Sequence, residues 1–125
     1  MSQFTFAGNA TTVQLLAAVS AANTAAATGG WVDIRAYDTP LAIVQNGGLG
    51  TGTLDGKIQD ATDISGTGVA DVSGATFTQK TTTVNQQVLA LQPRSTRGFI
   101  RYLGTVGTGP QLVGVDLVGV KKIAP

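Results

Sequence analysis

Residues 53–80 read TLDGKIQDATDISGTGVADVSGATFTQK and predict two β-strands joined by a glycine-rich turn. Leu54 and Ile58 fall on one side of an extended chain, because side chains alternate along a strand. Asp, Ser, Thr and Gly at residues 61–68 are typical of a turn. Residues 69–79 then return as a second extended segment. We expect the rest of the chain to build further strands against this unit.

Five more segments have the composition and alternation of strands, and turn residues separate them. About seven or eight short strands at regular spacing, without a long helical pattern, predict an all-β fold. We therefore expect an antiparallel β-sandwich that is jelly-roll-like. The five additional segments are residues 31–37, 41–46, 86–92, 97–106 and 111–120.

The first part of the chain is the least determined by its sequence. Residues 2–6 alternate like a short edge strand, whereas the apolar residues at 13–19 fit both helical and extended spacing. Residues 23–30, NTAAATGG, have the composition of a linker. Three alternatives stay open: a strand or short helix packed on its own domain, an arm that reaches a neighbouring subunit, or a disordered tail. The predicted division is an N-terminal arm or extension at 1–30 and a β-sandwich domain at 31–125.

Composition limits the possible partners of the chain. Its 125 residues suffice for one domain, and its formal net charge of +1 predicts no strong affinity for a polyanion such as nucleic acid. Only 12% of its residues are charged, against roughly 25% in an ordinary soluble domain. A weakly charged surface suits a protein that covers much of itself with partners. No segment has the roughly 20 apolar residues of a membrane helix, and no basic export signal begins the chain, so we expect no membrane partner.

The residue inventory argues against catalysis. The chain contains no His, Cys or Glu, which excludes histidine triads, thiol nucleophiles and most zinc sites. Asp55, Asp60 and Asp63 could form an acid–base pair or a calcium site, but they lack the spacing of an EF-hand and fit strand-surface and turn positions. The glycines of residues 47–52, GGLGTG, indicate a turn, because no GK[ST] motif follows them. We expect no enzyme activity, no cofactor and no metal.

Several predicted strands are apolar on both faces, although one face of each sheet in a two-layer sandwich should meet water. We expect another subunit or the N-terminal segment to cover the second face. The residues concerned are Phe99, Leu103, Leu112, Val118 and Val120.

Two further groups are candidates for an interface. Arg94, Arg97 and Arg101 cluster around one turn and strand, where they could meet a carboxylate on a partner or a nucleic-acid phosphate. The alternative is a charged edge that resists unwanted strand pairing. Trp31 and Tyr37 fall on one face of a predicted strand and could form a sugar-binding platform, although such residues also suit a core or a subunit interface.

Four motifs follow one another within residues 31–120: PLAIVQNGG, LDGKIQDATDISG, DVSGATFTQ and RGFIRYLGTVGTG, before an apolar final strand. This pattern resembles small β-sandwich virion proteins of tailed bacteriophages, and it looks most like capsid decoration, or cement, proteins. The resemblance implies a structural protein on the capsid surface of the virion. It also implies a homotrimer that binds the major capsid protein and bridges capsomers. The alternatives are a carbohydrate-binding or adhesin module and a head–tail or tail structural protein.

Overall fold

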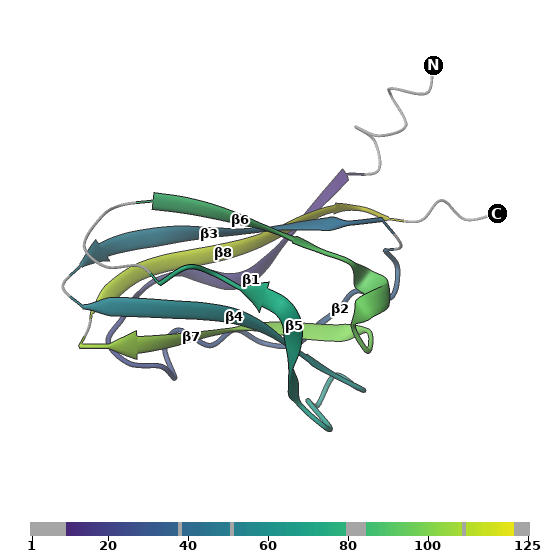
Figure 1. The fold of residues 1–125 in the computed structure, drawn as a ribbon, viewed down its shortest axis with the longest axis horizontal. Coiled ribbons are helices and arrows are strands. Elements are labelled where there is room, and N and C mark those ends of the chain that lie inside the picture. The colour runs from purple at the N-terminus through teal and green to yellow at the C-terminus, as the bar shows by residue number, and fades with distance from the viewer. Residues whose placement is uncertain (1–9, 38, 51, 80–84, 109, 122–125) are drawn as a thin grey trace, which may run out of the picture.

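The fold consists of two four-stranded antiparallel sheets packed face to face (Figure 1). The structure, a computed structural model, describes residues 10–37, 39–50, 52–79, 85–108 and 110–121. The predicted all-β sandwich is confirmed, while the strand predicted at residues 2–6 lies outside the described residues.

The strand order is that of a jelly roll, in which eight strands are shared between two sheets. Successive strands alternate between the sheets, except for the hairpin of β4 and β5. A 3-10 turn, η1 (Pro93–Ser95), precedes β7. The first sheet contains β1 (Ala10–Ala21), β8 (Gln111–Val120), β3 (Leu41–Gly50) and β6 (Asn85–Leu91), in this spatial order. The second sheet contains β2 (Val32–Asp33), β7 (Phe99–Gly107), β4 (Thr53–Ala61) and β5 (Ala70–Thr76).

The hairpin predicted at residues 53–80 is present as β4 and β5. Its pairing is irregular, because Lys57 lies opposite Thr76 whereas Gln59, only two residues later, lies opposite Asp71. The extra residues of β5 form a bulge around Gly74, whose φ of 77° is favourable only for glycine. The bulge bends β5 at the edge of the second sheet.

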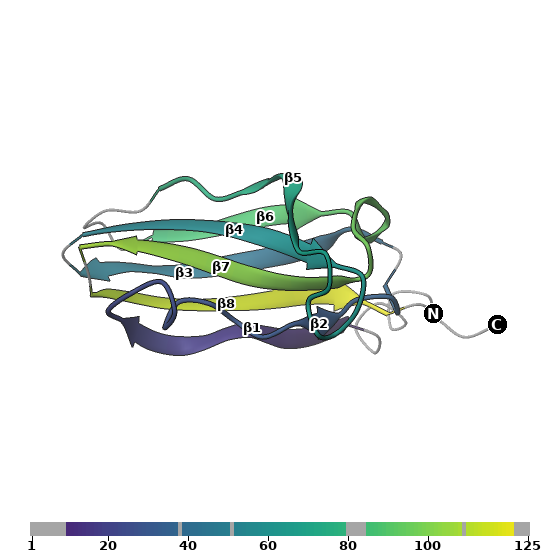
Figure 2. The same cartoon turned by 90° about the horizontal axis from the view of Figure 1, so that it is seen from below.

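The described part of the N-terminal segment, residues 10–30, packs against the sandwich. β1 pairs along its length with β8 at one edge of the first sheet (Figure 2). Bulges in β1 place both Leu15 and Leu16 in the core, which explains why the apolar spacing did not distinguish helix from strand. Residues 23–30 are not a free linker, because Gly29 N–H donates to the carbonyl of Tyr102 in β7 at 2.9 Å.

The strand predicted at residues 31–37 is much shorter than expected. Only Val32 and Asp33 pair with β7, and the chain then turns, with Tyr37 N–H donating to the Ile34 carbonyl at 3.1 Å. Because of this turn, Ile34 and Tyr37 are both buried, although strict alternation would have put them on opposite faces.

The first glycines of the turn predicted at residues 47–52 belong to a strand. β3 continues to Gly50 and stays paired with β8, with Gly47 opposite Val113. A side chain at Gly47 would lie 2.4 Å from the Leu112 carbonyl oxygen. Glycine is therefore required here by the close approach of a neighbouring strand and not by a turn.

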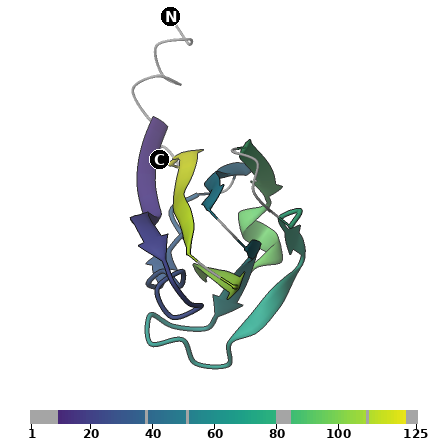
Figure 3. The ribbon, with the colours of Figure 1, turned by 90° about the vertical axis from the view of Figure 1, so that its left-hand side faces the viewer.

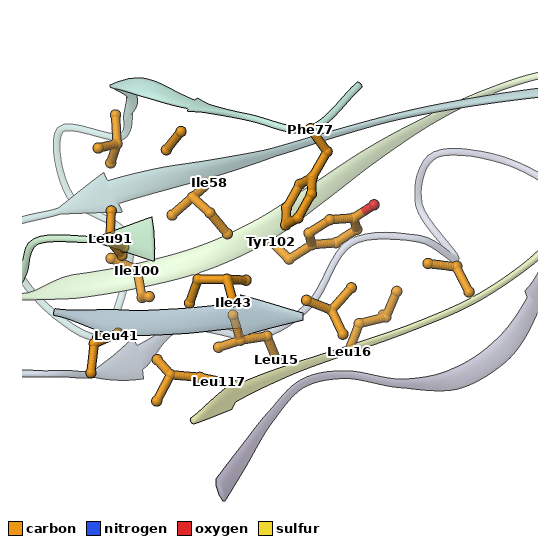
Figure 4. Packing of buried hydrophobic residues seen from close by; sticks show 14 of the residues in the cluster. Leu15, Leu16, Leu41, Ile43, Ile58, Phe77, Leu91, Ile100, Tyr102 and Leu117 are labelled. Carbon is orange, nitrogen blue, oxygen red and sulfur yellow. The ribbon is translucent and has the colours of Figure 1, made fainter. Parts of the chain in front are cut away.

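The core lies between the two sheets, which form its two walls when the molecule is seen from one end (Figure 3). Leu41, Ile43 and Leu117 project from the first sheet toward Ile58 and Ile100 of the second (Figure 4). These side chains are at most 1% exposed, so they contribute most strongly to the hydrophobic stabilisation of the fold.

One polar contact crosses the core. The Tyr102 hydroxyl donates a hydrogen bond to Gln45 Oε1 at 2.5 Å, and both residues are fully buried. The ring of Tyr102 also meets Phe77 edge-on, with 6.1 Å between ring centroids (Figure 4). A side chain at Gly56 would collide with the Tyr102 hydroxyl and Gln45, so glycine in β4 makes room for this contact.

Candidate interaction surfaces

The outward side of the first sheet carries almost no charge. Asp116 is the only charged residue in its four strands. Val88, Leu112 and Val118 on this side are 62%, 43% and 38% exposed. We call the following outward residues the neutral face: Thr12, Gln14, Ala42, Val44, Asn46, Gln86, Val88, Ala90, Leu112, Gly114, Asp116, Val118 and Val120.

A groove of about 550 Å³ lies on the neutral face over β8. Gly114 has no side chain to fill it, and Leu112 and Asp116 lie on its lining with residues of β1 and β3. Apart from Asp116 and a few amide and hydroxyl groups, the lining is aliphatic or glycine. The neutral face is thus a mostly uncharged surface with a hollow in it, which is a feature of surfaces that bind other proteins.

The second sheet carries charged side chains whose partners are other side chains of the same sheet. Lys57 Nζ lies 2.9 Å from Asp71 Oδ2, and the guanidinium of Arg101 donates to Gln59 Oε1 at 2.9 and 3.0 Å. Hydrogen bonds from Gln59 and Lys57 hold the pKa of Asp71 below its usual value. The two sides of the sandwich therefore differ in chemistry, and the first sheet has the lower desolvation cost on binding.

The structure brings together two of the three predicted interface arginines. Arg97 forms an ion pair with the buried Asp60, with 2.7 Å between Nη2 and Oδ1. Arg94 lies on η1, and both arginines line a cavity that they share with Arg35. Arg101 is placed elsewhere, on the outer side of β7.

The predicted aromatic platform is not formed, because Trp31 and Tyr37 do not share a surface. Tyr37 is 4% exposed, and its hydroxyl lies 2.7 Å from Thr11 Oγ1. Trp31 is half-buried, and the guanidinium of Arg101 lies 4.8 Å from its ring centroid. A sugar would find one aromatic ring here, already stacked against a cation of the same chain.

The five apolar residues expected to need a second cover fall into two groups. Phe99 is 8% exposed, and Leu103 and Val120 are half-buried within the chain. Leu112 and Val118 stay exposed on the neutral face. The described part of the N-terminal segment, residues 10–30, pairs with β8 and β7 and does not cover these two residues.

The three clustered aspartates have separate structural roles. Asp60 pairs with Arg97, while Asp55 accepts hydrogen bonds from Gln79 at 3.0 and 3.1 Å. Asp63 closes the turn between β4 and β5, where hydrogen bonding with Thr67 lowers its pKa. Among the described residues, no group of three acidic, His or Cys side chains is arranged to hold a metal ion.

Sequence reasoning missed several exposed residues and one arginine. Ile64 and Val69, in the turn between β4 and β5, are 57% and 46% exposed. The exposure of Val88 could have been predicted. Val88 and Leu89 point to opposite sides of the strand, and the side with the larger apolar residues packs inward. The position of Arg35 on the same cavity as Arg94 could not have been predicted, because it depends on the turn after β2.

In comparisons with known proteins, no protein family and no curated protein matches this chain. Within the described residues, no helix is long and apolar enough to cross a membrane.

Proposed function

We propose that this protein is a structural subunit of a bacteriophage virion, which decorates the capsid and stabilises it by bridging capsomers as a homo-oligomer. The observation that carries this proposal is the neutral face, a sheet surface with one charge and three exposed large aliphatic side chains. The motifs that resemble capsid decoration proteins are the reason for proposing a phage capsid as the assembly that this surface binds.

The jelly roll is compatible with this function without proving it. Capsid proteins, lectins and cupins all use this architecture, so the argument depends on surfaces. A stable protein interface buries about 1,600 Å² in total, and an almost uncharged sheet can contribute area with little desolvation of charge. A trimer would suit a threefold or quasi-threefold position on a capsid, because homo-oligomers usually adopt closed symmetry.

The carbohydrate-binding alternative loses its main support, since Tyr37 is buried and Trp31 is stacked with Arg101. The symmetry of the oligomer distinguishes a decoration protein from a head–tail or tail protein. Negative-stain images should show compact trimers for a decoration protein, whereas rings of higher order would indicate the head–tail or tail position.

The experiment that tests the proposal combines light scattering with capsid binding. The wild-type protein should be trimeric, bind expanded capsids that lack it and raise their thermal stability. Val88→Lys and Val118→Lys should abolish trimerisation or capsid binding while the fold is kept, because an interface would bury the new charge without a partner. Val69→Lys, at a similarly exposed valine outside the neutral face, is the matched control. A monomer with no affinity for capsids would refute the proposal.

A further inference from the structure

A second cavity, of about 450 Å³, lies between η1 and the turn that follows β2. Two stretches of the chain contribute three arginines to its lining: Arg35 after β2, and Arg94 and Arg97 in and after η1. Thr96 and Gly98 contribute to its polar lining. The fold thus places Arg35 on the same cavity as Arg94 and Arg97, which lie about sixty residues later in the sequence.

Two of these guanidinium groups are held in place by carboxylates of the same chain. Asp33 accepts hydrogen bonds from Arg35 Nε at 3.0 Å and Nη2 at 2.8 Å, and the same guanidinium lies 4.7 Å from the Phe99 ring centroid. Asp60 accepts hydrogen bonds from Arg97 Nε at 3.2 Å and Nη2 at 2.7 Å. Each arginine therefore uses one side of its planar fork, and within the described residues its Nη1 has no hydrogen-bond acceptor. Because these side chains are already ordered, a ligand would pay little entropy to organise them.

Arg94 supplies a positive charge that has no carboxylate partner among the described residues. It is exposed, while the preceding Pro93 is buried and anchors η1 to the core. No described carboxylate lies within 4.0 Å of its guanidinium. With Asp33 and Asp60 paired to the other two arginines, the described lining retains one net positive charge.

We propose that this cavity is a binding site for a carboxylate of a partner protein, an Asp or Glu side chain or a C-terminus. A carboxylate matches the fork geometry of guanidinium groups and carries one negative charge. A phosphate-rich ligand fits less well, because Asp33 and Asp60 are paired with two of the arginines and would repel its higher charge. The proposal holds for any protein that supplies the carboxylate, so it does not depend on the proposed virion function.

An NMR titration at low salt and neutral pH tests the site directly. The probe is the peptide acetyl-Gly-Asp-Asp-Gly-amide, and its neutral counterpart replaces both Asp residues with Asn. The acidic peptide should shift the backbone amide signals of Thr96 and Gly98 in a saturable manner, with a dissociation constant in the millimolar range that rises with added salt. Equal shifts with the neutral peptide, or no saturable shift with the acidic one, would overturn the proposal.

Three variants separate the site from general charge effects. Arg94→Gln should weaken peptide binding about tenfold or more, and Arg94→Lys should fall between it and the wild type, because lysine keeps the charge but lacks the fork. Arg101→Gln removes an arginine from outside the cavity and should leave binding unchanged. Unaltered binding in Arg94→Gln would contradict the proposal. If inorganic phosphate or oligothymidylate displaces the peptide at lower concentration than free acetate does, the site is a phosphate site and the choice of a carboxylate is wrong.

Discussion

Gln87 and Thr78 form a double hydrogen bond between the edges of the two sheets. Thr78 N–H donates to Gln87 Oε1 at 2.9 Å, and Gln87 Nε2 donates to the Thr78 carbonyl at 2.8 Å. Gln87 belongs to β6, the edge of the first sheet, and Thr78 follows β5, the edge of the second. The amide side chain thus satisfies backbone groups that a neighbouring strand would otherwise pair with, and it protects an edge against strand addition.

We expect Gln87→Ala to lower the free energy of unfolding by about 1 kcal/mol, the usual net value of hydrogen bonds of this kind. The amide of Thr78 should exchange with solvent much faster in this variant, as measured by hydrogen exchange. Gln87→Glu keeps an acceptor for Thr78 N–H and should retain the protection of that amide. Unchanged exchange at Thr78 in Gln87→Ala would show that the double bond does not form in solution.

The buried contact between Tyr102 and Gln45 leads to a double-mutant prediction. Within the described residues Gln45 Nε2 has no hydrogen-bond partner, so Tyr102→Phe would leave the whole buried amide unpaired. We expect this change to destabilise the protein by about 1–3 kcal/mol. Adding Gln45→Leu should recover most of that loss, because it removes the unpaired amide. Chemical denaturation of the four proteins in the cycle measures the coupling, and strictly additive effects would contradict it.

Asp33 should titrate far below an ordinary aspartate. Hydrogen bonds from the Arg35 side chain and backbone lower its pKa from 3.8 to about 2. Since the folded form binds the proton less readily than the unfolded form, this pair stabilises the protein above about pH 4, and the contribution disappears as the pH falls toward 2. The effect on stability is small, because the pair is exposed. NMR titration of the Asp33 carboxyl carbon checks the value, and Arg35→Met should return the pKa toward 3.8.

Gly66 and Gly74 provide a matched pair of substitutions. Both have positive φ angles, 85° and 77°, but a side chain at Gly66 would lie 2.5 Å from Trp31 Nε1, whereas nothing lies within 4 Å at Gly74. Each alanine substitution should cost about 1–2 kcal/mol for its backbone conformation. Gly66→Ala should cost more, because Trp31 must move, and it should change the tryptophan fluorescence. Equal melting temperatures of the two variants, with unchanged fluorescence, would show that the Trp31 ring accommodates the new methyl group without an energetic cost.

Much of the strand content could be predicted from the sequence, because alternation and turn residues are local signals. The alternation of Leu54 and Ile58 correctly predicted which side of β4 packs inward. The signal failed in β1, where bulges bury Leu15 and Leu16 in succession, and after Asp33, where a turn replaces the expected strand. In these places contacts distant in the sequence determine the backbone, and local periodicity does not record them.

By itself, the sequence determined the all-β class, the central hairpin and the absence of histidine, cysteine and glutamate chemistry, since composition and spacing are properties of the chain alone. Only the tertiary structure decided which sheet each strand joins. That pairing buries Tyr37 and Gln45, leaves Val88 and Leu112 on one nearly uncharged face, and gathers three arginines around one cavity. The physical reason is that burial and charge pairing depend on which segments become neighbours, and in a jelly roll those neighbours lie far apart along the chain.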